Sequence, residues 1–246
     1  MTARELYQAG KLAEAVQALN AELRDNPGDA KRRTFLFELL CFAGNFDRAD
    51  KQLEILAQES ADAQLGALVY RAALHAERIR SDLFQKKEYP QAAGGSAPAA
   101  YSGSWNGKPF QSISDMDARI GSRLEVFAAG QYLWLPFEHV ESIEVQAPKR
   151  LRDLIWATAI LRPSAAFQGR ELGEVLLPVL CPLSSQQADD ALKLGRSTEW
   201  KEIEPGDVVP FGQKMFLIDD EEVPILELRQ LEIRPESSVD QHVTAG

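Results

Sequence analysis

The chain has 246 residues, of which 45% are hydrophobic, so it is long enough to bury one or two cores. Its formal net charge is −10, and residues 1–90 are nearly neutral, with 13 Lys/Arg against 14 Asp/Glu, so the acidity lies in the rest of the chain. Phosphate contacts supply most of the affinity for nucleic acids, and no basic stripe is present to make them. The charge therefore argues against nucleic acid and against anionic membrane surfaces as partners.

Two features of the chain predict where it works. The cysteines, Cys41 and Cys181, each lie in an apolar run, which predicts reduced, buried thiols and excludes a disulfide scaffold. The opening stretch "MTARELYQ" reads as helix rather than as a secretion signal, and no apolar run reaches the roughly 18 residues that span a bilayer. We expect a cytoplasmic protein.

A seven-residue phrase recurs near the start of the chain. "AGKLAEA", residues 9–15, returns after 34 residues as "AGNFDRA", residues 43–49. A period of 34 with Gly, a bulky apolar residue and then Ala resembles the tetratricopeptide pattern of stacked helical pairs. Gly10 and Gly44 are expected to end first helices with positive φ, and Ala15 and Ala49 are expected where two helices cross closely.

The repeat predicts an all-helical first part, with a long last helix that begins after Asp62, an expected N-cap. Two and a half repeats are fewer than the three that usually cover a repeat core, so we expect the rest of the chain to pack against that helix. The predicted helices cover residues 2–9, 12–25, 30–43, 46–59 and 63–88.

The second part of the chain changes to a β-rich pattern. "RLEVFAAGQYLWLPF" predicts a hairpin with its turn at residues 129–130, and the acidic run 219–222 predicts a second hairpin turn. A short helix is expected at 185–194. The fold class is therefore α+β: a tetratricopeptide-like helical repeat domain followed by a mostly antiparallel β-rich domain. The expected divisions are repeats at 1–89, a Pro/Gly/Ser/Ala-rich linker at 90–109, an α+β domain at 110–235 and a polar tail at 236–246.

Candidate chemistry in the sequence is sparse. No two of the three histidines have metal-ligand spacing, and the chain carries neither a nucleotide-binding motif nor a nucleophile elbow, so we expect no cofactor and no metal. Asp115 is interpreted as a helix cap. The most unusual stretch is "LGRSTEW", residues 194–200, in which an arginine that donates to loop carbonyls is the structural interpretation. An enzyme of unknown class remains an alternative, with a site around Arg196, Glu199 and Asp117.

Several motifs together resemble one known family. They are "SISDMDARIGSRLEVFAAGQYLWLPFEHVESIEV", then "DLIWA", "LLPVL", "LGRSTEW" and the closing "LELRQLEI". Their order resembles the C-terminal domain of the ImpE/TagJ (SciE-type) accessory proteins of bacterial type VI secretion systems. Cys181 departs from the aromatic residue expected there. The resemblance implies a non-enzymatic cytoplasmic adaptor that binds the N-terminal segment of the small sheath subunit TssB and assists sheath disassembly by the ClpV unfoldase. Whether ClpV is contacted directly or only indirectly stays open.

The repeat agrees with such a role, because stacked helical pairs offer a concave face that takes an amphipathic helix or an extended peptide. Docking on the C-terminal domain or at the junction stays open, as does a chaperone role for another assembly. The residues expected on the concave face, besides Cys41, are Lys31, Thr34, Glu38, Phe42, Leu68, Ala72 and His75.

Overall fold

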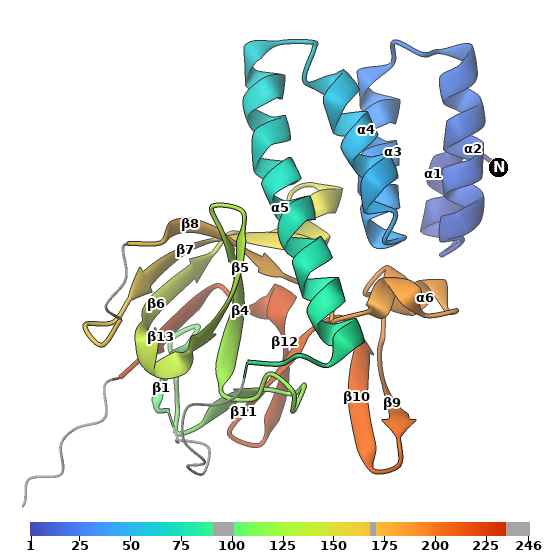
Figure 1. The fold of residues 1–246 in the computed structure, drawn as a ribbon. Coiled ribbons are helices and arrows are strands. Elements are labelled where there is room, and N and C mark those ends of the chain that lie inside the picture. The colour runs from blue at the N-terminus through green and yellow to red at the C-terminus, as the bar shows by residue number, and fades with distance from the viewer. Residues whose placement is uncertain (91–100, 168–170, 235–246) are drawn as a thin grey trace, which may run out of the picture.

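The computed structural model describes residues 1–90, 101–167 and 171–234, and its N-terminal part is a stack of antiparallel helices (Figure 1). Each helix packs on the next one along the chain, as the repeat predicts. Whether the stack is a tetratricopeptide array stays a prediction. The helices are α1 (Ala3–Gln8), α2 (Leu12–Asp25), α3 (Ala30–Phe42), α4 (Phe46–Leu56) and α5 (Ala61–Lys86).

The two glycines of the repeated phrase occupy the tight turns between helices, as expected. Gly10 has φ +79° and Gly44 has φ +68°, a backbone region that side chains disfavour. A Cβ on Gly44 would also lie 2.7 Å from the Ser185 hydroxyl, so this turn touches the second half of the chain. The repeat alanines, Ala15 and Ala49, are completely buried where helices cross.

A largely antiparallel sheet follows the helices, which confirms the α+β class. Its eight strands run in the order β2-β1-β13-β6-β7-β8-β4-β5. The β4–β5 hairpin turns at Ala129 and Gly130, both with positive φ, as predicted. The strands are β1 (Gly103–Trp105), β2 (Lys108–Phe110), β4 (Arg123–Ala128), β5 (Gln131–Pro136), β6 (Val140–Val145), β7 (Trp156–Pro163), β8 (Gly173–Pro178) and β13 (Gln230–Ile233).

Two smaller sheets complete the second half. One joins β3 (Ile113–Asp115) to the predicted acidic hairpin of β11 (Met215–Ile218) and β12 (Glu221–Pro224). The other is a projecting hairpin of β9 (Thr198–Glu204) and β10 (Asp207–Gly212), which the sequence did not predict (Figure 1). The expected helix at 185–194 is shorter: it consists of the 3-10 turn η3 (Ser184–Gln186) and α6 (Asp190–Lys193). The remaining 3-10 turns are η1 (Phe137–His139), η2 (Leu151–Leu154) and η4 (Ile225–Glu227).

The expected linker, residues 90–109, is partly folded. Strands β1 and β2 begin inside this range and add an edge to the large sheet, with Trp105 buried. The linker expectation is therefore wrong from residue 103 onward, because Tyr101 and Trp105 bury in the core of the sheet instead of leaving the segment free. Residues 91–100 and the expected polar tail at 236–246 lie outside the described residues.

The helices and the sheet share a hydrophobic core. Phe127, Trp156 and Leu180 of the second half cluster with the buried side chains of α2 to α5. Tyr70 of α5 stacks on Trp156 with ring centroids 6.0 Å apart. The second half thus packs against the long helix, as expected, and the division into separate domains stays a prediction. No helix in the described part of the chain is long and apolar enough to cross a membrane.

Candidate partner-binding surfaces

The C-terminal half of α3 is not available to a partner. Phe42 is completely buried and Cys41 is 3% exposed. Every residue from Leu36 to Phe42 is buried, because α3 lies between α2 and α4 and is covered on its remaining side by η2. The expectation that Phe42 contacts a bound peptide is therefore wrong: its ring fills the core between the helices.

Glu38 is occupied by the protein's own Arg152. The Arg152 Nη1 donates to the Glu38 carboxylate at 3.1 Å, and its Nε donates to the Tyr70 hydroxyl at 2.8 Å. The guanidinium also lies 4.9 Å from the centroid of the Tyr70 ring. Burial raises the pKa of Glu38, and the Arg152 charge opposes that rise. One arginine of η2 thus joins α3 to α5 across the inner side of the stack.

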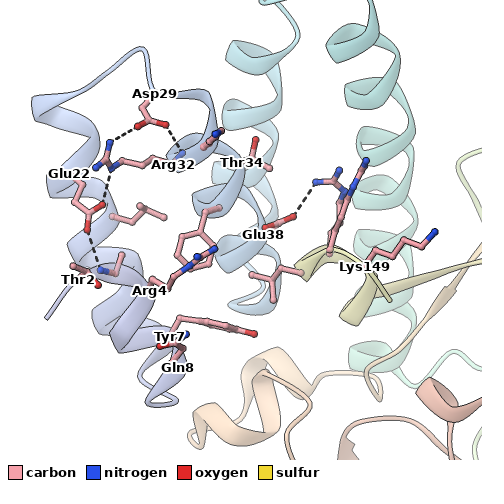
Figure 2. A pocket seen from close by; sticks show the side chains of 17 residues that line it. Thr2, Arg4, Tyr7, Gln8, Glu22, Asp29, Arg32, Thr34, Glu38 and Lys149 are labelled. Atoms are coloured by element: carbon pink, nitrogen blue, oxygen red, sulfur yellow. Dashed lines mark hydrogen bonds and ion pairs between the residues drawn. The ribbon is translucent and has the colours of Figure 1, made fainter. Parts of the chain in front are cut away.

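Lys31 and Thr34 lie on an open part of the same helix. They line two hollows, which also share Arg150 and Arg152. The first hollow, of about 1070 Å³, lies between α1, α2, α3 and residues 149–152 (Figure 2). The second hollow, of about 490 Å³, lies between α3, the end of α4 and the start of α5. The expected concave face is therefore open beside the N-terminal half of α3, whereas η2 fills it beside the C-terminal half.

Leu68, Ala72 and His75 lie together, but on another surface. Leu68 is 58% exposed and His75 is also exposed, whereas their neighbours Ala67, Ala73 and Leu74 are buried. Tyr70, which lines the second hollow, lies on the opposite side of α5 from Leu68. The seven predicted contact residues therefore do not form one surface. We name the α5 outer face by five residues: Leu65, Leu68, Ala72, His75 and Ile79.

The α5 outer face is largely apolar and uncovered over the first turns of the helix. Leu65 is 64% exposed and Ile79 is 40% exposed. The tip of the β4–β5 hairpin touches its middle, where Gly130 approaches Ala72. Consecutive members of the face are separated by three, four, three and four residues. This spacing is that of the seam along which two helices pack in a coiled coil.

The alternative enzyme site is not assembled. Arg196 donates to the carbonyl oxygens of Gln8 at 2.9 Å and Tyr7 at 2.6 Å, and it covers the Tyr7 ring. Asp117 is buried against Arg119, with a closest distance of 2.6 Å, and the exposed Glu199 pairs with Lys201 at 3.5 Å. Three separate partners hold these side chains, so they do not converge on one site. Arg196 instead donates to carbonyls in the last turn of α1, where a helix leaves acceptors that intrahelical bonds do not saturate, and it does so at the surface.

A buried ionic network, which the sequence patterns did not predict, joins α5 to the sheet. The Glu125 carboxylate accepts two bonds from Arg80, at 2.7 and 2.8 Å, and contacts the Lys214 ammonium at 2.7 Å. Lys214 also pairs with Asp115, which accepts a bond from the Asp117 N–H instead of capping a helix as expected. Burial raises the pKa of Asp115 to about 6, against the opposing charge of Lys214. Burial also acts to raise the pKa of Glu125, but Arg80 and Lys214 outweigh it and hold that pKa far below its usual range.

The fold defines a class of α+β proteins in which a short helical stack is fused to a largely antiparallel sheet through a common core. Residues 107–232 match the family model described as "ImpE protein". The chain is 32% identical, over 96% of its length and 92% of the relative's, to the "Type VI secretion system accessory component TagJ" of Pseudomonas aeruginosa. This chain belongs to the ImpE family.

A solved structure shares the fold. The crystal structure of protein VPA1032 from Vibrio parahaemolyticus superposes with a TM-score of 0.81 at 24% sequence identity. The match covers 94% of this chain and 97% of that one. The arrangement of helical stack and sheet is thus common to both proteins.

Proposed function

We propose that this protein is a non-enzymatic, cytoplasmic accessory component of a type VI secretion system. It binds the N-terminal segment of the small sheath subunit TssB and assists the disassembly of the sheath by ClpV. Membership of the ImpE family and the similarity to the Pseudomonas aeruginosa accessory component support the assignment to a type VI secretion system. The geometry of α5 supports binding to another chain.

The α5 outer face is the observation that carries the proposal. Large apolar side chains at helical spacing normally face a core, and Leu65, Leu68 and Ile79 instead face solvent. In a stack of helical pairs, this is the side on which the next helix would pack. The described part of the chain supplies no such helix, so a helix from a partner fits the position.

The chemistry of the face defines its ligand. An amphipathic helix with apolar residues three and four positions apart would interdigitate with Leu65 and Leu68. These two side chains lie on the part of the face that the tip of the β4–β5 hairpin, seated at Ala72, leaves open. Burying one exposed leucine side chain stabilises a complex by about 1.5–3 kcal/mol. The charged side of the same helix would remain in solvent. We therefore expect the TssB segment to bind as a helix.

Titration calorimetry with a synthetic N-terminal peptide of TssB tests the proposal. Wild-type protein should bind the peptide, and Leu68→Glu should weaken the affinity about tenfold or more, because a carboxylate cannot be buried in an apolar seam without a partner. Ile55→Glu is the matched control, since it places the same charge at an exposed apolar position of α4, away from the face. Absence of binding to folded wild-type protein, or equal weakening by both substitutions, would overturn the proposal.

A further inference from the structure

The first hollow is a second surface, separate from the α5 outer face. Its walls come from α1 on one side and from residues 149–152 on the other, with α3 between them (Figure 2). Its volume of about 1070 Å³ is at the upper end of the ~300–1,000 Å³ typical of small-molecule sites. The hollow is therefore large enough for several residues of an extended chain.

The charges that line the first hollow are unusual for this protein. The chain carries a net charge of −10, yet six cations and three carboxylates line the hollow. The carboxylates are already engaged: Glu22 and Asp29 pair with Arg32, and Glu38 pairs with Arg152. The four other cations, Arg4, Lys31, Lys149 and Arg150, form no ion pair with any residue in the described ranges. Four cations without an ion-pair partner among the described residues therefore line this hollow. Three further arginines without one in that part of the chain, Arg24, Arg33 and Arg48, line a separate hollow between α2, α3 and α4.

These four cations surround a partly apolar floor. Arg4 comes from α1 and Lys149 from the segment that leads into η2 (Figure 2). Lys31 comes from α3, and Arg150 directly precedes η2. Tyr7, Phe35 and Leu151 line the same hollow. A ligand that matches this arrangement carries several separated negative charges and some apolar surface. An extended peptide with Asp or Glu at alternate positions has both properties, since its side chains alternate between two directions.

We infer that the first hollow binds an acidic, extended segment of a partner protein. Its carboxylates would pair with Arg4, Lys31, Lys149 and Arg150, and its intervening side chains would cover Phe35. A nucleic acid strand is the competing anion, but its phosphates continue beyond the hollow, where the acidic remainder of the protein would repel them. A short acidic peptide pairs with the four cations and ends within the hollow, so it avoids this repulsion.

Fluorescence anisotropy with a labelled ten-residue peptide of alternating Glu and Ala tests this inference on the full-length protein. Wild-type protein should bind the peptide at low salt, and binding should weaken as salt increases, because exposed charge pairs are screened. The double substitution Arg4→Glu/Lys149→Glu, at two cations that line the first hollow and not the second, should weaken binding about tenfold or more, since two attractions become repulsions.

The matched control is Arg24→Glu/Lys51→Glu, which changes the net charge by the same amount at exposed helical positions outside the hollow. This variant should bind like wild type. Equal loss in both double variants, or tighter binding of a ten-nucleotide oligo-dT than of the peptide, would overturn the inference. Leu68→Glu should leave the acidic peptide bound, so failure at the α5 outer face and failure at the first hollow are distinguished.

Discussion

Glu125 balances two buried cations that come from distant parts of the chain. Its side chain has no exposed surface, and it faces Arg80 of α5 and Lys214 beside β11. Removal of one partner from a buried ionic group leaves the other charges uncompensated, which costs far more than loss of an exposed pair. The carboxylate thus holds α5 on the sheet.

We expect Glu125→Gln to lower the free energy of unfolding by about 3–5 kcal/mol, because Arg80 and Lys214 would then face each other without their shared counter-charge. Urea unfolding followed by circular dichroism measures this change. Glu144→Gln is the control: Glu144 lies 3.6 Å from Arg162 on the exposed surface of the sheet, and its loss should cost about 0.5 kcal/mol or less. Equal effects of the two substitutions would contradict the assigned role.

Asp115 gives the network a pH dependence of predictable sign. Its pKa of about 6 in the folded protein exceeds the ordinary value of 3.8, so the folded state holds a proton that the unfolded state releases. The contribution of Asp115 to stability is therefore greatest at low pH and falls as pH rises toward 6. Relative to Asp115→Asn, wild type should lose about 2 kcal/mol between pH 4.5 and pH 7. Urea unfolding at several pH values tests this, and a constant difference would refute it.

Residue patterns predicted which side chains mark turns but not which charges are buried together. Gly10 and Gly44 were predicted because a local conformation requires them. The partners of Glu125 lie 45 and 89 positions away in the chain, and no local pattern links them. Phe42 was misplaced for a related reason. Helical periodicity shows that a side chain lies on one face of a helix, but packing against other helices decides whether that face is buried.

At the level of elements, η2 acts as a clamp between α3 and α5. Arg152 reaches Glu38 of one helix and Tyr70 of the other. The segment around it, with Leu151 and Ile155, packs into the helical core. The inner side of the stack is thereby closed over part of its length by the protein itself.

Arg152→Met should lower the free energy of unfolding by about 3 kcal/mol, because the carboxylate of Glu38 would stay buried without its cation. Adding Glu38→Gln should recover about 1–2 kcal/mol of that loss, since the uncompensated charge is then removed. Chemical denaturation of the two single variants and the double variant measures the coupling. Arg162→Met, at an exposed position of β7, is the control and should be nearly neutral. Strictly additive losses would contradict a direct contact.

The helices were predicted to within a few residues, and the predicted hairpins are present, because their signals are local: periodicity, capping and turn residues. The β9–β10 hairpin was missed because β9 is a largely exposed strand of mixed polarity, without the regular alternation of a half-buried one. Strands β1 and β2 were read as linker from their Gly, Ser and Pro content. The place of β1 in the sheet is fixed by pairing with β13, more than a hundred residues further on, and β2 pairs with β1.

In the whole molecule, the α5 outer face and the first hollow both lie on the helical stack. The α5 outer face is apolar and has helix-packing spacing, whereas the first hollow is cationic and suits an extended chain. The shared core and the Glu125 network fix α5 against the sheet, so both surfaces are preformed. Such a body can hold a segment of a partner without folding around it, which limits the entropy lost on binding.

Binding of a helical TssB segment to the α5 outer face, as proposed, can be tested by hydrogen exchange of the protein with and without the TssB peptide. Bound peptide should slow amide exchange in the first turns of α5, over residues 61–71, because a packed partner suppresses local opening. The projecting β9–β10 hairpin should exchange at its unbound rate. Slowed exchange in that hairpin or in another part of the sheet, with the start of α5 unchanged while the peptide is bound, would contradict the account.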